Sequence, residues 1–309
     1  MGRFVLRRFL SIIPTVFVII TLGFFLIRAA PGGPFSREKA VPPGVLANLL
    51  AKYHMDEPLI KQYFRFMGGV LRGDLGPSFK NKDFTVNELI WAGLPNSIIL
   101  GLTAIGIAVV LGVTTGIVSA LKQNSAVDYT VMSVAVTGIS IPTFVVGPVL
   151  MLVFAILLKW LPTSGWIDGR HGLKTMIMPA ITLSLPQFAY IARLMRASML
   201  ETLRSDYVRT ARAKGLSMPV IIFKHVLKGA CLPVVSYLGP AVALVITGSV
   251  VVERIFAIPG LGMHFVRSAI NRDYTMIMGT VIVYSLILIA LNFIVDIVYG
   301  FLDPRITYK

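Results

Sequence analysis

The chain alternates between long uncharged hydrophobic stretches and polar segments that carry its charged residues. A helix needs about 17 to 25 apolar residues to cross the hydrocarbon core of a bilayer, so each long stretch predicts a transmembrane helix. The stretches are 9–27, 97–121, 129–158, 175–192, 229–252 and 274–295. We therefore expect an all-α integral membrane protein with six transmembrane helices and a long first loop between the first two of them.

Composition agrees with this pattern. Hydrophobic residues make up 56% of the 309 residues and charged residues only 14%, which is too apolar for one soluble domain. The first stretch has 19 apolar residues, whereas a signal peptide usually has about 7 to 15, so we expect an uncleaved anchor. The single cysteine, Cys231, leaves no intramolecular disulfide.

Lys and Arg predict the orientation. Six spans place both termini on one side, and the tails and loops of that side hold 14 basic residues. The short loops of the other side hold six. Because basic residues concentrate in cytoplasmic loops, we expect both termini in the cytoplasm. Membrane topology and anionic lipid account for most of the net charge of +15, so nucleic acid is not expected as a partner.

The first loop is long enough to fold by itself. Residues 56–58 are two acidic residues followed by proline, a pattern typical of a helix N-terminus, and apolar residues at helical spacing follow them. This pattern predicts a capped helix that reaches about residue 72. We divide the chain into an N-terminal transmembrane anchor with an extracytoplasmic loop domain, 1–96, and a five-span core domain, 97–309. Covering the helix bundle and receiving a delivery protein are both open as roles of the loop.

Prolines interrupt the hydrophobic spans. Each one removes a backbone donor and bends its helix, which suits a pathway that opens and closes. Proline is also common in ordinary transmembrane helices, so pathway lining remains one of two readings. The candidate pathway kinks are Pro142, Pro148, Pro179 and Pro186.

Several chemistries are missing from the sequence. The spans hold no carboxylate or histidine, which an ion-driven secondary carrier usually keeps inside the membrane. No nucleophile with its base, no metal-ligand set and no Gly-rich ATP loop occurs. We therefore expect no enzyme activity and no bound cofactor or metal, and energy for uphill transport would come through contact with another polypeptide.

The loop 193–228 is the segment most suited to such a contact. Read as a helix, it places Val208, Ala211 and Gly215 on one face and basic side chains around them. Small residues let another surface approach, and Gly215 can end the helix in a left-handed conformation. A basic helix resting on anionic lipid is the alternative. The candidate coupling residues are Asp206, Arg209, Thr210, Ala211, Arg212, Ala213, Lys214, Gly215, Leu216 and Ser217.

This segment resembles the coupling loop of ABC-transporter permease subunits, although its ending at His225 departs from the family pattern. The segments 27–34, 73–79 and 271–274 resemble outer-loop motifs of the dipeptide and oligopeptide permease family. A further outer-loop motif of that family is carried by Glu253, Pro259, Gly260 and Gly262. The resemblance extends over nearly the whole chain and is closest to the B-type membrane subunits of bacterial oligopeptide permeases.

The resemblance implies a multi-pass subunit of the bacterial cytoplasmic (inner) membrane that imports oligopeptides by alternating access. It implies four kinds of partner: a second homologous permease subunit, two cytoplasmic ATPases that use the ATP, an extracytoplasmic peptide-binding protein and membrane lipid. A dipeptide, glutathione or nickel importer of the same family is the alternative. A secondary carrier is disfavoured, because the spans hold no carboxylate or histidine that could bind a coupling ion.

Overall fold

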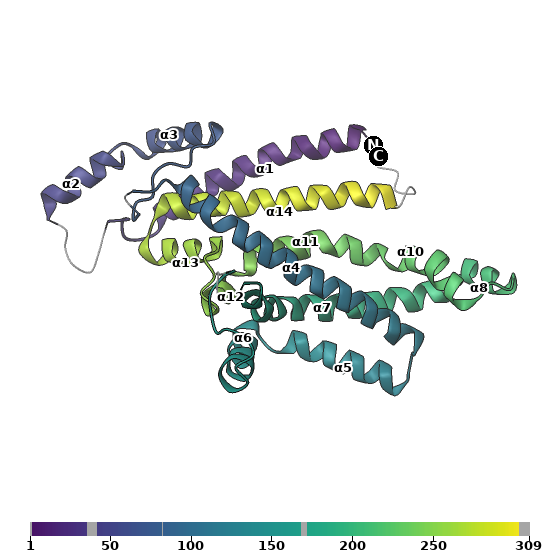
Figure 1. The fold of residues 1–309 in the computed structure, drawn as a ribbon. Coiled ribbons are helices and arrows are strands. Elements are labelled where there is room, and N and C mark those ends of the chain that lie inside the picture. The colour runs from purple at the N-terminus through teal and green to yellow at the C-terminus, as the bar shows by residue number, and fades with distance from the viewer. Residues whose placement is uncertain (1, 36–41, 82, 168–171, 303–309) are drawn as a thin grey trace. The chain divides into compact units, whose positions relative to one another are not determined.

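The computed structural model describes residues 2–35, 42–81, 83–167 and 172–302, and helices make up most of them (Figure 1). Five helical stretches there are long and apolar enough to cross a membrane. They are α1 (Gly2–Ala29), α4 (Val86–Leu121), α7 (Lys174–Leu203), α11 with α12 (Leu232–Gly248 and Val250–Ile255) and α14 (Tyr274–Leu302). The predicted all-helical membrane fold is confirmed for this part of the chain. Arg170, Arg305 and Lys309, which entered the charge count, lie outside it.

The third hydrophobic stretch, predicted at 129–158, forms two helices rather than one. Helix α5 (Ala126–Ser140) lies at 104° to a second helix composed of α6 (Thr143–Leu150) and the π-helical segment η1 (Met151–Leu157). The break falls at Ile141, whose extended conformation (φ −94°, ψ 119°) is the one that a residue before proline prefers. Counting the bent pair as one span gives six spans in the described chain.

The other candidate kink prolines lie within helices. Pro148 lies inside α6, shortly before the backbone adopts π-helical geometry. Pro179 and Pro186 lie inside α7, which continues through both for 30 residues. Pro142 is therefore the only one of the four at which the helix stops.

The chain divides into two compact units. The core unit holds residues 98–258 and the described residues from 290 onward, and the loop unit holds residues 2–97 and 259–289. Helices α4 and α14 contribute residues to both units. Each unit has its own buried hydrophobic clusters, so each is described separately below.

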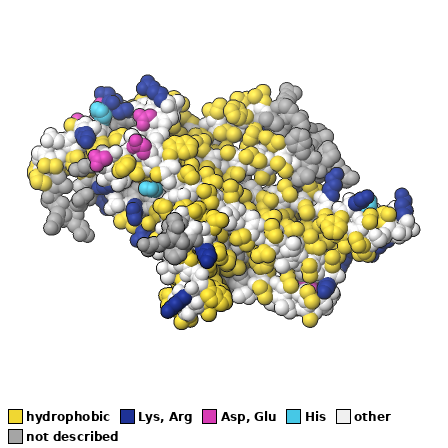
Figure 2. All heavy atoms as spheres, in the orientation of Figure 1, with side chains coloured by type: hydrophobic (Ala, Val, Ile, Leu, Met, Phe, Trp, Pro, Cys, Tyr) yellow, Lys and Arg dark blue, Asp and Glu magenta, His cyan; other side chains and the backbone are white. Residues whose placement is uncertain are grey.

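Helix α7 forms the centre of the core unit. Helix α5 packs along it, with Ala135 of α5 buried against Ala189 and Ala192 of α7. Helix α4 also approaches it closely, because a side chain at Gly116 would begin only 2.7 Å from the carbonyl oxygen of Ala192. Gly106 of the same helix, by contrast, faces open space. Figure 2 shows hydrophobic side chains over much of this unit, as expected of helices exposed to lipid.

The loop unit contains three further helices, α2 (Pro43–Lys52), α3 (Leu59–Leu71) and α13 (Leu261–Asn271). Helix α3 confirms the helix predicted in the first loop, but no side chain caps its first turn. Glu57 instead forms ion pairs with Lys61 (3.3 Å) and Arg65 (2.7 Å), and hydrogen bonding by Arg65 lowers the pKa of the Glu57 carboxyl group. The predicted position of the helix is thus right, and the predicted capping is wrong.

Candidate functional site

The predicted coupling segment forms a short helix, α8 (Asp206–Ala213), within the core unit. Its end has the hydrogen bonds of a Schellman motif: the Leu216 amide donates to the Ala211 carbonyl oxygen (3.3 Å) and the Gly215 amide to that of Arg212 (2.9 Å). Gly215 has a φ of +78°, the left-handed conformation expected from the sequence. A side chain at Gly215 would meet no atom within 4 Å in this chain, so the backbone angle is what requires glycine there.

One face of α8 packs against the core unit. Val208 is fully buried and Ala211 is 5% exposed, in a cluster with Met195 and Met199 of α7. Val208 and Ala211 thus share one face, and that face packs against this chain rather than lying open to a partner. Gly215 was expected on the same face, but it is exposed beyond the end of the helix. The Schellman motif ends the helix before its periodicity reaches that residue.

The rest of α8 and the segment after it are exposed. Residues 212–219 are all exposed, and large apolar side chains project among the basic ones. Tyr207 is 50% exposed, Leu216 40% and Met218 43%. Figure 2 shows Lys and Arg side chains gathered around α8. Exposed apolar groups rimmed by charge are typical of a protein contact surface.

Helices also occupy the segments on either side of α8. Residues 193–203, predicted as part of the loop, are the last turns of α7. After α8 the chain continues through α9 (Met218–Val220), π-helical η2 (Ile221–Val226) and α10 (Leu227–Ala230) to the next span. Ile221 and Val226 of η2 are buried in the same cluster as Val208. The coupling segment is therefore attached through packed helices to two membrane-spanning helices.

A buried ion pair lies where three core helices meet, and the sequence analysis did not identify it. Arg196 of α7 binds Asp128 of α5 with two hydrogen bonds of 2.7 Å each. Ser119 of α4 donates a further hydrogen bond to the same carboxylate, and the Asn124 amide donates another at 2.9 Å. Asp128 is 1% exposed. The carboxylate thus connects α4, α5 and α7 at one point, through charge-assisted bonds that are among the stronger hydrogen bonds in proteins.

The described residues around α8 are arranged in a way that can transmit movement. No group of three His, Cys, Asp or Glu residues among them could hold a metal ion. Arg196, Ser119 and the Asn124 amide occupy the Asp128 carboxylate. What the arrangement can do is transmit a displacement of α8 to α7, because their contact is close-packed and apolar.

The predicted outer-loop motif begins in the core unit with a buried carboxylate. Glu253 on α12 is fully buried, and the Ser249 hydroxyl donates to it at 2.5 Å. Ala257 has a φ of +53°, and the Ile258 amide donates to the Glu253 carbonyl oxygen at 2.8 Å. These bonds fold the chain into a tight turn at the end of the α12 helix.

The second half of this motif lies in the loop unit, where the chain passes close to the start of α4. A side chain at Gly93 would begin 3.0 Å from the Gly260 backbone. Asn96 donates to the Pro259 carbonyl oxygen (2.8 Å), and Ser97 accepts from the Leu261 amide (2.9 Å). Gly262 is buried in the first turn of α13. These motif residues therefore shape the backbone of the loop unit.

Two of the other outer-loop motifs meet at Asp273. Its buried carboxylate accepts hydrogen bonds from the Ser78 hydroxyl (2.5 Å), the Phe79 amide (3.1 Å) and the Met276 amide (3.2 Å). The last of these caps the first turn of α14. The neighbouring Tyr274 donates to the Gly32 carbonyl oxygen at 2.8 Å. The motif residues at 32, 78–79 and 273–274 are thus held together by side-chain hydrogen bonds.

Two family models match the chain. Residues 112–308 match the binding-protein-dependent transport system inner membrane component, and residues 1–100 match the N-terminal membrane component of such systems. Together they cover the chain except residues 101–111, within α4, and residue 309.

Curated relatives match over full length. The chain is 52% identical over 308 residues to the oligopeptide transport system permease protein OppB of Salmonella typhimurium, covering 100% of both. It is 47% identical to the dipeptide transport system permease protein DppB of Bacillus subtilis, covering 99% of this chain and 98% of the relative. Among solved structures, an inward-facing methionine ABC transporter, MetNI, shares the fold with a TM-score of 0.58 at 18% identity, covering 70% of this chain and 96% of the matched one.

Proposed function

Because the chain belongs to the family of binding-protein-dependent transport system inner membrane components, we propose that it is the permease subunit of an ATP-driven oligopeptide importer. The observation that carries the proposal is the 52% identity, over both full lengths, to an oligopeptide permease protein. The bundle of apolar helices provides the span through which a transported molecule would pass.

In this proposal α8 is the helix that contacts the ATPases. Its inner face is anchored by Val208 and Ala211, while Leu216 and Met218 leave apolar area for a partner. The exposed candidate coupling residues act together as this contact surface, which Ala211 anchors from inside; they are Asp206, Arg209, Thr210, Arg212, Ala213, Lys214, Gly215, Leu216 and Ser217. A movement of the partner would displace α8 as a rigid body and tilt α7 with it, which is the kind of step that alternating access requires.

The remaining partners follow from the same proposal. A second homologous permease subunit would complete the pathway, two cytoplasmic ATPases would bind and hydrolyse the ATP, and an extracytoplasmic binding protein would deliver peptide. The chain itself is a transport component of the membrane rather than an enzyme. We place it in the bacterial inner membrane with both termini in the cytoplasm.

The pathway and the domain division belong to the proposal too. The 104° break at Pro142 supports a movable element, and Pro148, Pro179 and Pro186 are the other candidate kinks along the pathway. One family model ends at residue 100 and the other begins at residue 112, which supports a division of the chain near residue 97. The motif residue Glu253 would hold the end of α12 in shape within the core unit, and Pro259, Gly260 and Gly262 would do the same for the backbone of the loop unit.

A dipeptide importer is the second candidate. The 47% identity to a dipeptide permease protein favours it specifically. Both candidates share the fold, the ATPase contact and the partners, and they differ only in the length of the peptide. Selectivity in both would be set mainly by the binding protein.

Affinity purification tests the function directly. A tagged chain, extracted in mild detergent, should retain a second permease and two ATPases, and its complex should hydrolyse ATP faster when the binding protein and a peptide of several residues are added. Stimulation by dipeptides alone would select the second candidate. A chain that moves peptide by itself along a proton gradient would contradict both.

Labelling of introduced cysteines tests the orientation. Cysteine at Asp206 should resist an impermeant thiol reagent in intact cells, whereas cysteine at Lys61 should react. Both positions are well exposed, at 94% and 64% of the side chain, so the difference would report sidedness rather than burial. A Cys231→Ser background removes the one native thiol, so that labelling reports only the introduced cysteine. The reverse labelling pattern would overturn both the orientation and the ATPase contact.

A further inference from the structure

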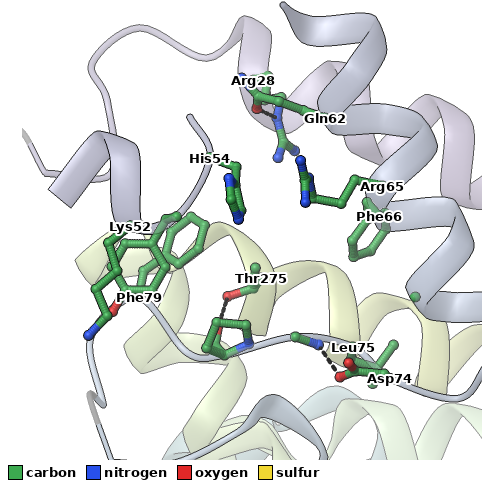
Figure 3. Close-up of a pocket in the computed structure, with 14 residues that line it drawn as sticks. Arg28, Lys52, His54, Gln62, Arg65, Phe66, Asp74, Leu75, Phe79 and Thr275 are labelled. Atoms are coloured by element: carbon green, nitrogen blue, oxygen red, sulfur yellow. Dashed lines mark hydrogen bonds between the residues drawn. The ribbon is translucent and has the colours of Figure 1, made fainter. Parts of the chain in front are cut away.

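A basic pocket lies in the loop unit beside the end of the first membrane-spanning helix. Its cavity measures about 370 Å³. Figure 3 shows Arg28, His54 and Arg65 pointing into it from three segments, with their nitrogen atoms toward one another. The side wall includes the aromatic rings of Phe66 and Phe79. The pocket therefore offers clustered donors for an anion together with apolar walls.

Arg28 is the donor best placed to bind a ligand. Its Nε donates to the buried Gln62 side chain at 3.1 Å, and its guanidinium carbon lies 3.6 Å from the centre of the Phe24 ring. These contacts fix the guanidinium group in a half-buried position. Among the described residues, no carboxylate pairs with it. A fixed, partly desolvated cation without a counter-ion favours an anionic ligand.

Two acidic groups near the pocket, Glu57 and Asp74, offset only part of its positive charge, and Glu57 also lies 3.7 Å from His54. Glu57 is engaged by Arg65 at 2.7 Å and by Lys61 at 3.3 Å. The Asp74 carboxylate accepts a hydrogen bond of 2.8 Å from the Gly76 amide. Lys52 also lines the cavity, so cationic side chains outnumber acidic ones around it.

The pocket lies at the depth where the membrane span ends. Arg28 belongs to the last turn of the apolar span Leu6–Ala29. Helix α3 packs along the last turns of the same span: Tyr63 hydrogen-bonds Thr21 at 2.9 Å, and its ring lies edge-on to Phe24. The end of an apolar span is the level of lipid headgroups, so the pocket faces the phosphate layer of the bilayer.

The outer face of α3 is apolar at the same depth. Ile60, Phe64 and Leu71 are 59%, 67% and 81% exposed, and with Met67 they follow the i, i+4, i+7, i+11 spacing of one helix face. An exposed apolar stripe next to a membrane span is suited to lie among acyl chains. It places the tails of a lipid beside a pocket that binds its headgroup.

We propose that this pocket binds the phosphate group of an anionic phospholipid, with Arg28 as the main donor and the stripe Ile60, Phe64, Met67 and Leu71 in contact with the acyl chains. Arg65 and His54 supply the additional donors. The lipid would hold α3 against the end of α1. The site is independent of the proposed transport function, because it requires only that α1 spans the membrane.

Lipid titration of the purified full-length chain in neutral detergent tests the site. Phosphatidylglycerol should raise the melting temperature and stay bound in native mass spectrometry, whereas phosphatidylcholine should do so weakly. Arg28→Gln should weaken phosphatidylglycerol binding about tenfold, because a charge-assisted hydrogen bond is lost. Arg72→Gln, the same charge change at an exposed position outside the pocket, should weaken it less than about twofold.

Two further arms keep the result unambiguous. Phe64→Ser changes only an exposed side chain, so it should fold normally and still lose several-fold in affinity for phosphatidylglycerol. Soluble glycerol phosphate should not raise the melting temperature to a comparable extent. Equal losses for Arg28→Gln and Arg72→Gln, or full affinity in Phe64→Ser, would overturn the proposal. Protection by glycerol phosphate equal to that by lipid would assign the pocket to a free phosphate instead.

Discussion

Replacing Gly215 with leucine should reduce peptide uptake at least tenfold while the amount of chain in the membrane stays unchanged. A φ of +78° costs an L-residue about 1 to 2 kcal/mol, so the end of α8 would shift or unwind. The new side chain would also project from an exposed surface, where nothing in this chain lies within 4 Å. If an ATPase surface occupies that space, both effects impair docking. Uptake and co-purification of the ATPases are the measurements.

Three further variants separate docking from the alternatives. Gly73 has nearly the same φ, +76°, and equally open surroundings, so Gly73→Leu introduces similar backbone strain away from α8 and should leave the ATPases bound. Gly215→Asn adds a small side chain that tolerates the left-handed conformation and should keep much of the uptake. Lys214→Gln removes one exposed charge, which changes attraction to anionic lipid by only about 1 kcal/mol.

The lipid-surface interpretation of α8 makes the opposite prediction. There a larger apolar residue at position 215 is harmless, and removal of the Lys214 charge does the damage. Normal uptake and normal ATPase binding by Gly215→Leu would remove the main support for α8 as the coupling helix.

Features encoded locally could be predicted from the sequence. Five apolar stretches became membrane-length helices, because their length and lack of charge depend on no distant residue. The left-handed end of α8 was predictable for the same reason, since Gly215 follows directly on the helical pattern. The helix of the first loop was also visible, but Glu57 binds Lys61 and Arg65 rather than capping the helix.

The size of the bend at Pro142 was not predictable. A proline in an apolar run permits a mild kink as well as a complete break. The 104° angle depends on where α6 finds its neighbours, and Gly147 of α6 lies against Ile255 and Phe256, more than a hundred residues later in the chain. Hydropathy alone shows the stretch as one long span and gives no information about that contact.

Polar contacts between residues far apart in the sequence could not be predicted either. Asp273 binds Ser78 across 195 positions, and Arg196 binds Asp128 across 68. Each residue alone resembles an ordinary charged or polar group at the end of a span. Periodicity describes one helix at a time, whereas these pairs depend on which helix ends meet in the fold.

The Asp128–Arg196 pair should be the most sensitive single contact for the stability of the core unit. Arg196→Gln should destabilise the chain by about 3 kcal/mol, the lower end of the range for breaking a buried ion pair. The Arg196 side chain is 27% exposed and that of Asp128 is 2% exposed, so losing the cation leaves the more deeply buried charge without its partner. Thermal unfolding in detergent measures the effect as a lowered melting temperature.

The reverse change should cost less. Asp128→Asn keeps a neutral acceptor for Ser119 and the Asn124 amide, while Arg196 retains some access to solvent. Combining Asp128→Asn with Arg196→Gln should recover part of the loss, because no unpaired charge then remains in the interior. The difference between the double variant and the sum of the single ones gives the coupling energy of the pair.

An exposed pair in the same unit provides the matched control. Asp206 and Arg209 lie 3.3 Å apart on α8, with side chains 94% and 77% exposed, and such pairs contribute about 0 to 1 kcal/mol. Arg209→Gln should therefore leave the melting temperature nearly unchanged. If Arg196→Gln behaves like Arg209→Gln, the buried pair does not hold α4, α5 and α7 together. If Arg196→Gln alone lowers stability and also weakens the response of ATPase activity to peptide, the junction of those three helices carries the movement of α8 into the membrane.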